Sequence, residues 1–318
     1  MKMYNQNINR LLQLIVAASF NLFAFAQSST TKDKWDETAT KTYSKSYTLN
    51  NEKVSIENKF GKLIIDTWDK NEVKVDAEIF VGTDTKEYAD MMLSKINIVD
   101  EKQGDEISFK TIMDKWDEDK TDKKGRNQQL RVDVTVHLPA TAKLFASNSF
   151  GPLTIKDFKG EVDLISKFGS LETGKLANAK SVTVEFGKAY IESAANAKFV
   201  FKYSRIDVKK IEGSIKGNFD YCNSVDLSVD ANVKSIDLKC SYTSTHLEIE
   251  KNASIDYTII TNNARASSSS AFTLTEEKKD NTSNKLYYNP NHKYSGSIGK
   301  SGGTQINIQS NFGNVRFI

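Results

Sequence analysis

An aromatic residue followed by a small residue, most often glycine, recurs along this chain at steps of about 18 residues. This repeat limits the possible fold more than any other feature. The clearest copies are Phe150-Gly151, Phe168-Gly169, Phe186-Gly187, Tyr203-Ser204 and Tyr221-Cys222. More degenerate copies centre on Phe60-Gly61, Tyr242-Thr243 and Phe312-Gly313. Apolar and polar residues alternate on both sides of each aromatic, so each copy predicts two short strands joined at a bend.

One copy is too small to fold alone, because its few apolar side chains cannot offset the cost of ordering its backbone. Stacked copies would share backbone hydrogen bonds and one continuous core. We therefore predict an all-β fold, a parallel β-solenoid of ~18-residue two-strand coils that lie ~4.8 Å apart.

The position of the aromatic in each coil sets its phase, that is, which of the neighbouring residues point inward and which point outward. Val182, Val184 and Phe186 fall on one face of a strand, so we expect all three to point into the core. Glycine follows the aromatic because the chain bends there, and we expect that glycine to need a positive φ. Short polar residues that could satisfy the bend's free backbone groups precede the aromatic by two positions: Asn58, Asn148, Ser166 and Ser310. After the bend, the positions expected inward include Leu171/Thr173, Ala189/Ile191, Val225/Leu227 and Leu247/Ile249.

The repeat defines one solenoid domain over residues 51–318, with two interruptions. Residues 83–129 read as a small insertion, with a helix over 85–95 capped by Asp84 and a hairpin of 96–99 and 106–112. Residues 266–303 read as a polar loop that Tyr287 and Tyr288 could pin. Ahead of the domain, residues 27–50 are Ser/Thr-rich and polar, and we expect a flexible leader.

The first 26 residues have the pattern of a signal peptide. Lys2 and Arg10 precede an apolar run from Leu11 to Phe25, and Ala24-Phe25-Ala26 is a small-x-small cleavage site. Removing them leaves 42 basic against 41 acidic residues and no transmembrane segment. The pattern predicts an exported protein, in the periplasm, at the outer-membrane surface or outside the cell. The balanced charge argues against nucleic acid as a partner.

Two outward columns follow from the phase. The residue before the aromatic alternates in sign in successive copies, as Lys167, Glu185, Lys202 and Asp220, which would favour stacking in register. The fourth residue after the aromatic forms a second column, with Glu172, Tyr190 and Asp207. Allowing for inserted residues, we expect this column to continue to Asp226 and Glu248. Stacked carboxylates could bind a ligand, or act as acid and base on a sugar chain; they are equally typical of a solvated β-face.

No other pattern indicates chemistry. Cys222 and Cys240 lie 18 residues apart, but the phase puts Cys240 inward and Cys222 at the corner, so we expect free thiols rather than a disulfide. The scattered His137, His246 and His292 lack metal-ligand spacing. Asp117, Asp119 and Asp122 lie in a charge run without the glycine and distal carboxylate of a calcium loop. We predict no metal and no cofactor.

Several of these segments together resemble a known family. The chain has an export signal, an early Asn-Lys-Phe-Gly-Lys-Leu-Ile-Ile copy (58–65), an inserted helix and hairpin, a Leu-Arg-Val-Asp-Val-Thr-Val-His-Leu-Pro strand (130–139) and serial x-Phe-Gly-x-Leu-x-Ile copies. Over residues 50–82 and 130–265 it resembles the DUF4097 adhesin-type β-repeat proteins of Bacteroidetes. That family carries no established catalytic residues, so the resemblance transfers no site. This chain departs from it at Ser204, Cys222 and Thr243, which stand in place of glycine.

These observations predict a non-enzymatic, exported protein of the cell envelope that binds a glycan or an envelope protein, or that has a structural role. The alternative is a polysaccharide lyase or hydrolase built on a β-helix, with the acidic column as its active site. A third hypothesis is an envelope sensor or stress-response accessory that meets a membrane partner.

Overall fold

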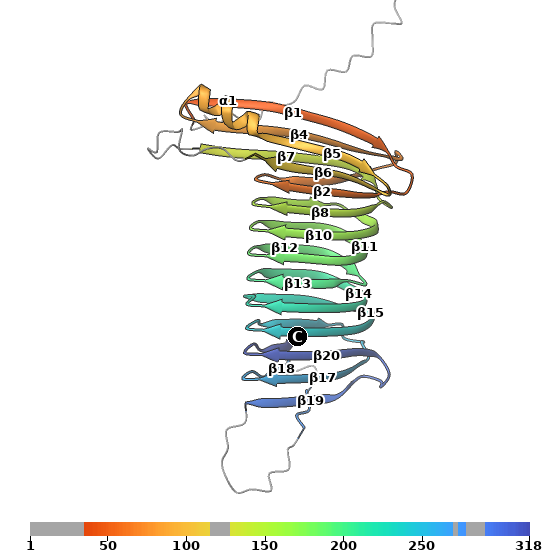
Figure 1. Ribbon diagram of the computed structural model, residues 1–318. Helices are drawn as coiled ribbons and strands as arrows, with labels where there is room; N and C mark the ends of the chain where they lie inside the picture. The colour runs from red at the N-terminus through yellow and green to blue at the C-terminus, as the bar shows by residue number, and fades with distance from the viewer. Residues whose placement is uncertain (1–34, 115–127, 270–272, 278–289) are drawn as a thin grey trace, which may run out of the picture. The chain divides into compact units, whose positions relative to one another are not determined.

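Two parallel ladders of short strands, joined at the aromatic corners, form the body of residues 36–318 (Figure 1). The computed structural model describes residues 35–114, 128–269, 273–277 and 290–318. Ladder A holds the strands before each corner: β6 (Glu106–Met113), β2 (Lys53–Lys59), β8 (Lys143–Ser149), β10 (Phe158–Lys167), β13 (Lys198–Lys202), β20 (Thr304–Asn311) and β17 (Ile255–Asn262). Ladder B holds those after it: β3 (Leu63–Trp68), β9 (Pro152–Ile155), β12 (Lys188–Ala195), β16 (Thr245–Ile249), β21 (Val315–Phe317) and β18 (Ala266–Ser268).

Three long strands belong to both ladders, because each bends from ladder B into ladder A. These are β11 (Ser170–Glu185), β14 (Arg205–Asp220) and β15 (Ser224–Ser241). Their first halves pair in register with ladder B, as Leu171 does with Ala189, and their second halves pair with ladder A, as Val184 does with Phe201. The predicted parallel solenoid is therefore confirmed.

The core lies between the ladders and follows the predicted phase. Val182 and Val184 are fully buried, and so are the partners that stack on them in the next coil, Phe199 and Phe201. The inward positions expected after the corner are buried in every coil named above. Because each apolar side chain packs against one from the coil above and one from the coil below, burial continues from coil to coil.

The corner aromatics do not share this core, and here the prediction was wrong. Phe186 has φ 56° and is 47% exposed, and the other corner aromatics likewise have positive φ. The left-handed conformation of Phe186 interrupts the alternation of inward and outward side chains. Its ring, which would otherwise follow Val184 on the inward face, therefore points outward.

The glycine after each aromatic has a steric role, not the conformational one expected. Among the described corners the aromatic itself takes the positive φ, and Gly187 does not. A Cβ on Gly187 would overlap the carbonyl oxygen of Gly169 in the next coil, and a Cβ on Gly169 would overlap that of Gly151. Glycine thus allows close backbone approach between coils. Where Ser204 replaces it, the hydroxyl donates to the Lys202 carbonyl at 2.7 Å and accepts from Gly187 N–H at 3.2 Å.

Antiparallel strands and the insertion close the N-terminal end. In ladder B, β3 pairs with β7 (Gln128–Pro139), which pairs with β4 (Glu72–Thr83), which pairs with β1 (Glu37–Thr48). In ladder A, β6 pairs with β2 and with β5 (Ile96–Gln103), so the predicted hairpin extends the solenoid. The helix α1 (Lys86–Lys95) precedes β5, and its N-cap residue is Thr85 rather than Asp84. Among the described residues, no helix is long and apolar enough to span a membrane.

Strand β1 occupies half of the range expected as a flexible leader. Its sequence shows little apolar periodicity because it is an edge strand whose side chains are largely exposed. It is fixed instead by polar contacts with β5: the hydroxyls of Tyr43 and Tyr47 both donate to the Asp100 carboxylate, and Lys41 donates to Asn97 at 2.9 Å. Residues 1–34, with the predicted signal peptide and the start of the leader, lie outside the described residues.

At the C-terminal end the order of coils in space departs from the order in the chain. β20 pairs with β15 on one side and with β17 on the other, and β21 pairs with β16 and β18. The last strands therefore lie between two coils that precede them in sequence (Figure 1).

The range expected as a polar loop, 266–303, contains two strands, β18 and β19 (Asn291–Ile298). β19 pairs antiparallel with β17, and its other side bonds to residues 275–277. It was missed because Tyr294 is its one buried residue, so it lacks an apolar pattern. Tyr287 and Tyr288 lie outside the described residues, as does the charge run that holds Asp117, Asp119 and Asp122.

Candidate functional site

The corner aromatics form a continuous stack of rings along the outside of the solenoid. The aromatic stack consists of Phe60, Phe150, Phe168, Phe186, Tyr203, Tyr221, Tyr242 and Phe312. Successive ring centroids lie 4.8–5.2 Å apart, with interplanar angles of 3–8°. The stacking of the rings follows from the fold, because the spacing between coils of a parallel sheet is close to the stacking distance of aromatic rings.

The stack presents ring edges to solvent and hides ring faces. From Phe150 to Phe312 its seven rings are each 47–51% exposed. Both faces of an internal ring such as Phe186 are covered, by Phe168 at 4.9 Å and Tyr203 at 4.8 Å. A ligand that binds by lying flat on an aromatic face, as sugars do, finds no free face within the stack. An apolar surface that packs against ring edges does fit it.

Sequence reasoning found these residues but placed them in the core. A signal for their exposure exists. Glu185 and Lys188 are both outward and polar, yet they are three positions apart, an odd spacing that strict alternation does not allow. The alternation therefore has to break between them, at Phe186 or Gly187.

The predicted acidic column lies on the outer face of ladder B. The strand register places Glu172 beside Tyr190, Tyr190 beside Asp207, and Asp207 beside Asp226. The residue opposite Asp226 in the next coil is His246, whereas Glu248 pairs with Ser228. Glu248 is thus displaced from the column by two positions. His246 is the fourth residue after Tyr242, so this coil keeps the regular spacing and lacks the insertion that was expected there.

Two carboxylates of this column, those of Asp207 and Asp226, contact neighbouring side chains. Asp207 bonds Lys209 at 2.7 Å, and this hydrogen bond raises the pKa of Lys209. Asp226 Oδ1 lies 2.6 Å from His246 Nδ1 and its Oδ2 accepts from Ser224 at 3.2 Å. Asp207 and Asp226 are therefore paired with basic side chains, and neither of the two depressions described next includes residues of the column.

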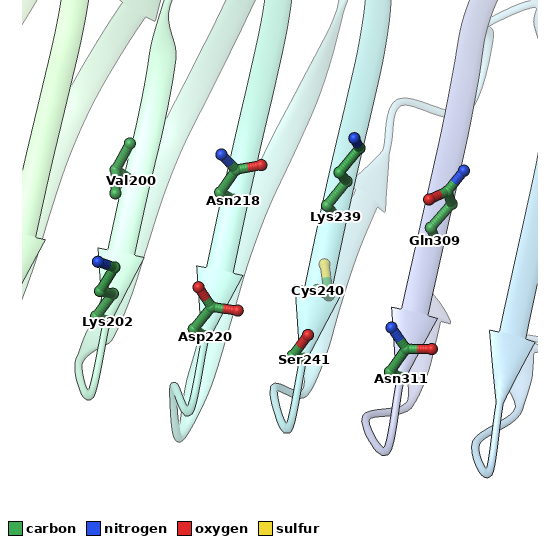
Figure 2. Close-up of a pocket in the computed structure, with 9 residues that line it drawn as sticks. All are labelled: Val200, Lys202, Asn218, Asp220, Lys239, Cys240, Ser241, Gln309 and Asn311. Atoms are coloured by element: carbon green, nitrogen blue, oxygen red, sulfur yellow. The ribbon is translucent and has the colours of Figure 1, made fainter.

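A shallow polar depression of about 440 Å³ lies on the outer face of ladder A, beside the second half of the aromatic stack. Figure 2 shows its residues side by side on four adjacent strands, β13, β14, β15 and β20. The lining is Val200, Lys202, Asn218, Asp220, Lys239, Cys240, Ser241, Gln309 and Asn311. Its floor forms because short side chains stand between longer ones, and three amides and two ammonium groups supply hydrogen-bond donors.

A second depression of about 420 Å³ lies near the turn after β3 and is lined by residues 67–71, 139–141 and Lys159. Its aromatic residue, Trp68, is already in contact with two partners. The ring stacks on His137 at 5.3 Å, and Lys70 Nζ lies 4.7 Å from its centroid. The depression on ladder A is therefore the better candidate for a binding site.

The two cysteines are buried free thiols in this structure. Cys240 faces inward, where burial raises its pKa to about 12, and Cys222 lies at a corner, where burial also raises its pKa. Over the described residues, no group of three or more His, Cys, Asp and Glu side chains is placed to hold a metal ion.

Comparisons with known proteins give only remote likenesses. No protein-family model matches the chain, and no curated protein matches it. Among solved structures, it is similar to a "putative cell adhesion protein" from Clostridium sporogenes, at 12% identity over 88% of this chain and 99% of that one, with a TM-score of 0.25. It is also similar to a "putative adhesin" from Bacteroides fragilis, at 12% identity over 87% and 97% with a TM-score of 0.30, and to another from Parabacteroides distasonis, at 13% identity over 87% and 97% with a TM-score of 0.30. We assign no function from likenesses this remote, and membership of the DUF4097 family stays a prediction.

Proposed function

We propose that this chain is an exported, non-enzymatic protein of the cell envelope that binds a hydroxyl-rich ligand, such as a glycan, on the outer face of ladder A. An adhesin-type role of this kind is supported by a rigid repeat that presents flat, solvated β-faces. The predicted signal peptide supports export.

The observation that carries the proposal is the polar depression in Figure 2. The side chains of Asn218, Gln309 and Asn311 offer both donors and acceptors, which is the chemistry that recognises sugar hydroxyls. They lie on adjacent coils of a rigid sheet, so little backbone freedom remains to be lost on binding. The site is open along the solenoid axis, which suits an extended chain better than a small enclosed molecule.

A glycan array and a cell-adhesion screen test this proposal. Asn218→Ala and Gln309→Ala each remove an amide from the depression and should weaken binding of any glycan hit about tenfold, since each removes one or two hydrogen bonds. Thr183→Ala is the matched control, because Thr183 stands in the same outward column two coils away from Asn218. Binding that is unchanged by both depression variants, or absent from the array and the adhesion screen, would contradict the proposal.

A polysaccharide-degradation assay separates this function from the lyase or hydrolase alternative. The proposal expects no turnover by the wild-type protein. Turnover that is lost in Glu172→Gln or Asp207→Asn would instead make the column on ladder B an active site.

A further inference from the structure

The aromatic stack exposes a long, continuous row of ring edges, which is apolar except for the hydroxyls of its three tyrosines. Seven rings that are each about half exposed leave on the order of 100 Å² apiece, or roughly 700 Å² in one row. The largest apolar patch on a typical monomer is about 300–600 Å² and is often functional. The row is also straight and rigid, because each ring is held between its neighbours.

The kind of partner is limited by what the row exposes. The covered ring faces exclude sugar stacking on the internal rings. The flanking column of ladder A carries charges of both signs, Lys167, Glu185, Lys202 and Asp220, which does not suit an anionic membrane surface. A partner with a matching apolar edge and the complementary order of charges is required, and a second copy of this chain, turned end to end, has both.

The complementarity follows from a twofold axis placed between Phe186 and Tyr203, the midpoint of the eight rings. Such an axis sets two stacks antiparallel and brings the same side of each solenoid together. Phe186 then faces the partner's Tyr203. In the flanking column, Lys167 faces the partner's Asp220 and Glu185 faces the partner's Lys202, and the twofold repeats both pairs.

Within one chain, Glu185 already bonds Lys167 at 3.0 Å and Lys202 at 3.7 Å, so the pairs across the axis would extend an existing network. On the ladder B side, Lys188 faces the partner's Arg205, an unfavourable pair. Both are long, exposed side chains at the rim, where they can turn toward solvent, so this repulsion is small.

We propose that two copies of this chain associate through their aromatic stacks, antiparallel about this twofold axis. Burying the exposed edges of both stacks removes at most roughly 1,400 Å² from solvent, and about 1,200–2,000 Å² is the range of stable protein interfaces. The interface is isologous, as expected for a closed dimer. This proposal does not depend on the proposed ligand, because the mass of the particle is its readout.

Sedimentation equilibrium of the exported protein tests the proposal, with a dimer expected at micromolar concentrations. Lys167→Glu places like charges against the partner's Asp220 twice and should raise the dimer Kd at least tenfold at low salt. Adding Asp220→Lys to the same chain restores opposite charges across the axis and should return the Kd to near its wild-type value.

The double variant also separates the interface from the fold. Within one chain it places like charges side by side at both positions, next to Glu185 and next to Lys202. Its thermal stability, measured at a concentration where both variants are monomeric, should therefore fall below that of Lys167→Glu alone. A dimer that returns while stability falls further can only come from the contact between copies. Wild-type protein that stays monomeric up to about 100 µM, or a double variant no more dimeric than Lys167→Glu, would overturn the proposal.

Discussion

Replacing Phe186 with alanine and with glycine tests how the corner aromatics stabilise the fold. About half of the ring is buried, so its removal returns on the order of 100 Å² to water and costs about 2.5 kcal/mol. Its two stacking contacts, with Phe168 and Tyr203, add about 0.5–1.5 kcal/mol each. Phe186→Ala should therefore lower the free energy of unfolding by roughly 4 kcal/mol.

Glycine should be less harmful than alanine at this position. Alanine keeps the cost of about 1 kcal/mol that an L-residue incurs at φ 56°, and glycine does not. Phe186→Gly should thus lose roughly 3 kcal/mol, about 1 kcal/mol less than Phe186→Ala. This order is opposite to that expected within a strand, where glycine is the more destabilising residue.

Tyr190 provides the matched control. It is an aromatic of similar exposure, 42%, but it lies within β12 and outside the aromatic stack. There, glycine should be worse than alanine, and Tyr190→Ala should cost less than Phe186→Ala by the stacking energy, about 1–3 kcal/mol.

Guanidinium unfolding followed by circular dichroism measures these differences, at one fixed protein concentration because association would shift the apparent stability. If glycine proves worse than alanine at Phe186, the left-handed corner is not a source of strain. If Phe186→Ala costs no more than Tyr190→Ala, the rings do not stabilise one another.

Two further predictions concern buried polar groups. Asn148 donates to the carbonyls of Gly61 at 3.0 Å and Pro152 at 2.9 Å, so Asn148→Ala should cost about 2–3 kcal/mol in thermal unfolding. Asn148→Ser should cost less, because Ser310, at the same position of its own corner, donates its hydroxyl to the Gly313 carbonyl. An equal loss in both variants would contradict this. Burial acts to raise the pKa of Asp100, but hydrogen bonds from Tyr47 and Tyr43 outweigh it and hold the pKa below its ordinary value. The stability from this group is therefore present above the unfolded pKa, about 3.9, and is lost as the pH falls through the lowered folded pKa. Tyr47→Phe should speed hydrogen exchange of β1 at neutral pH by about fivefold, and the difference should shrink toward pH 2; a difference that is independent of pH would refute the role of the carboxylate.

The sequence was sufficient to predict the features that depend on its repeat and on the alternation of apolar and polar residues. The 18-residue spacing fixed the stacking of coils, and alternation identified buried residues such as Val182 and Phe201. The column of alternating charges before the aromatics was also predictable, and within it Glu185 forms ion pairs with Lys167 and Lys202.

The features that were missed depend on geometry that the period does not encode. The direction of Phe186 depends on a single left-handed residue. The depression on ladder A joins β20 to β15, strands that are distant in sequence, so no local pattern could have brought Gln309 beside Lys239.

The place of β20 and β21 between earlier coils has a consequence for how the protein is made. A solenoid whose coils lie in chain order can assemble progressively as it emerges from a ribosome or a translocon. Here residues 255–268 do not pair with the coil that precedes them, residues 235–249, because residues 304–317 lie between the two. Residues 255–268 can therefore reach their final pairing only after residues 304–317 have been synthesised, so the C-terminal end of the solenoid is completed last.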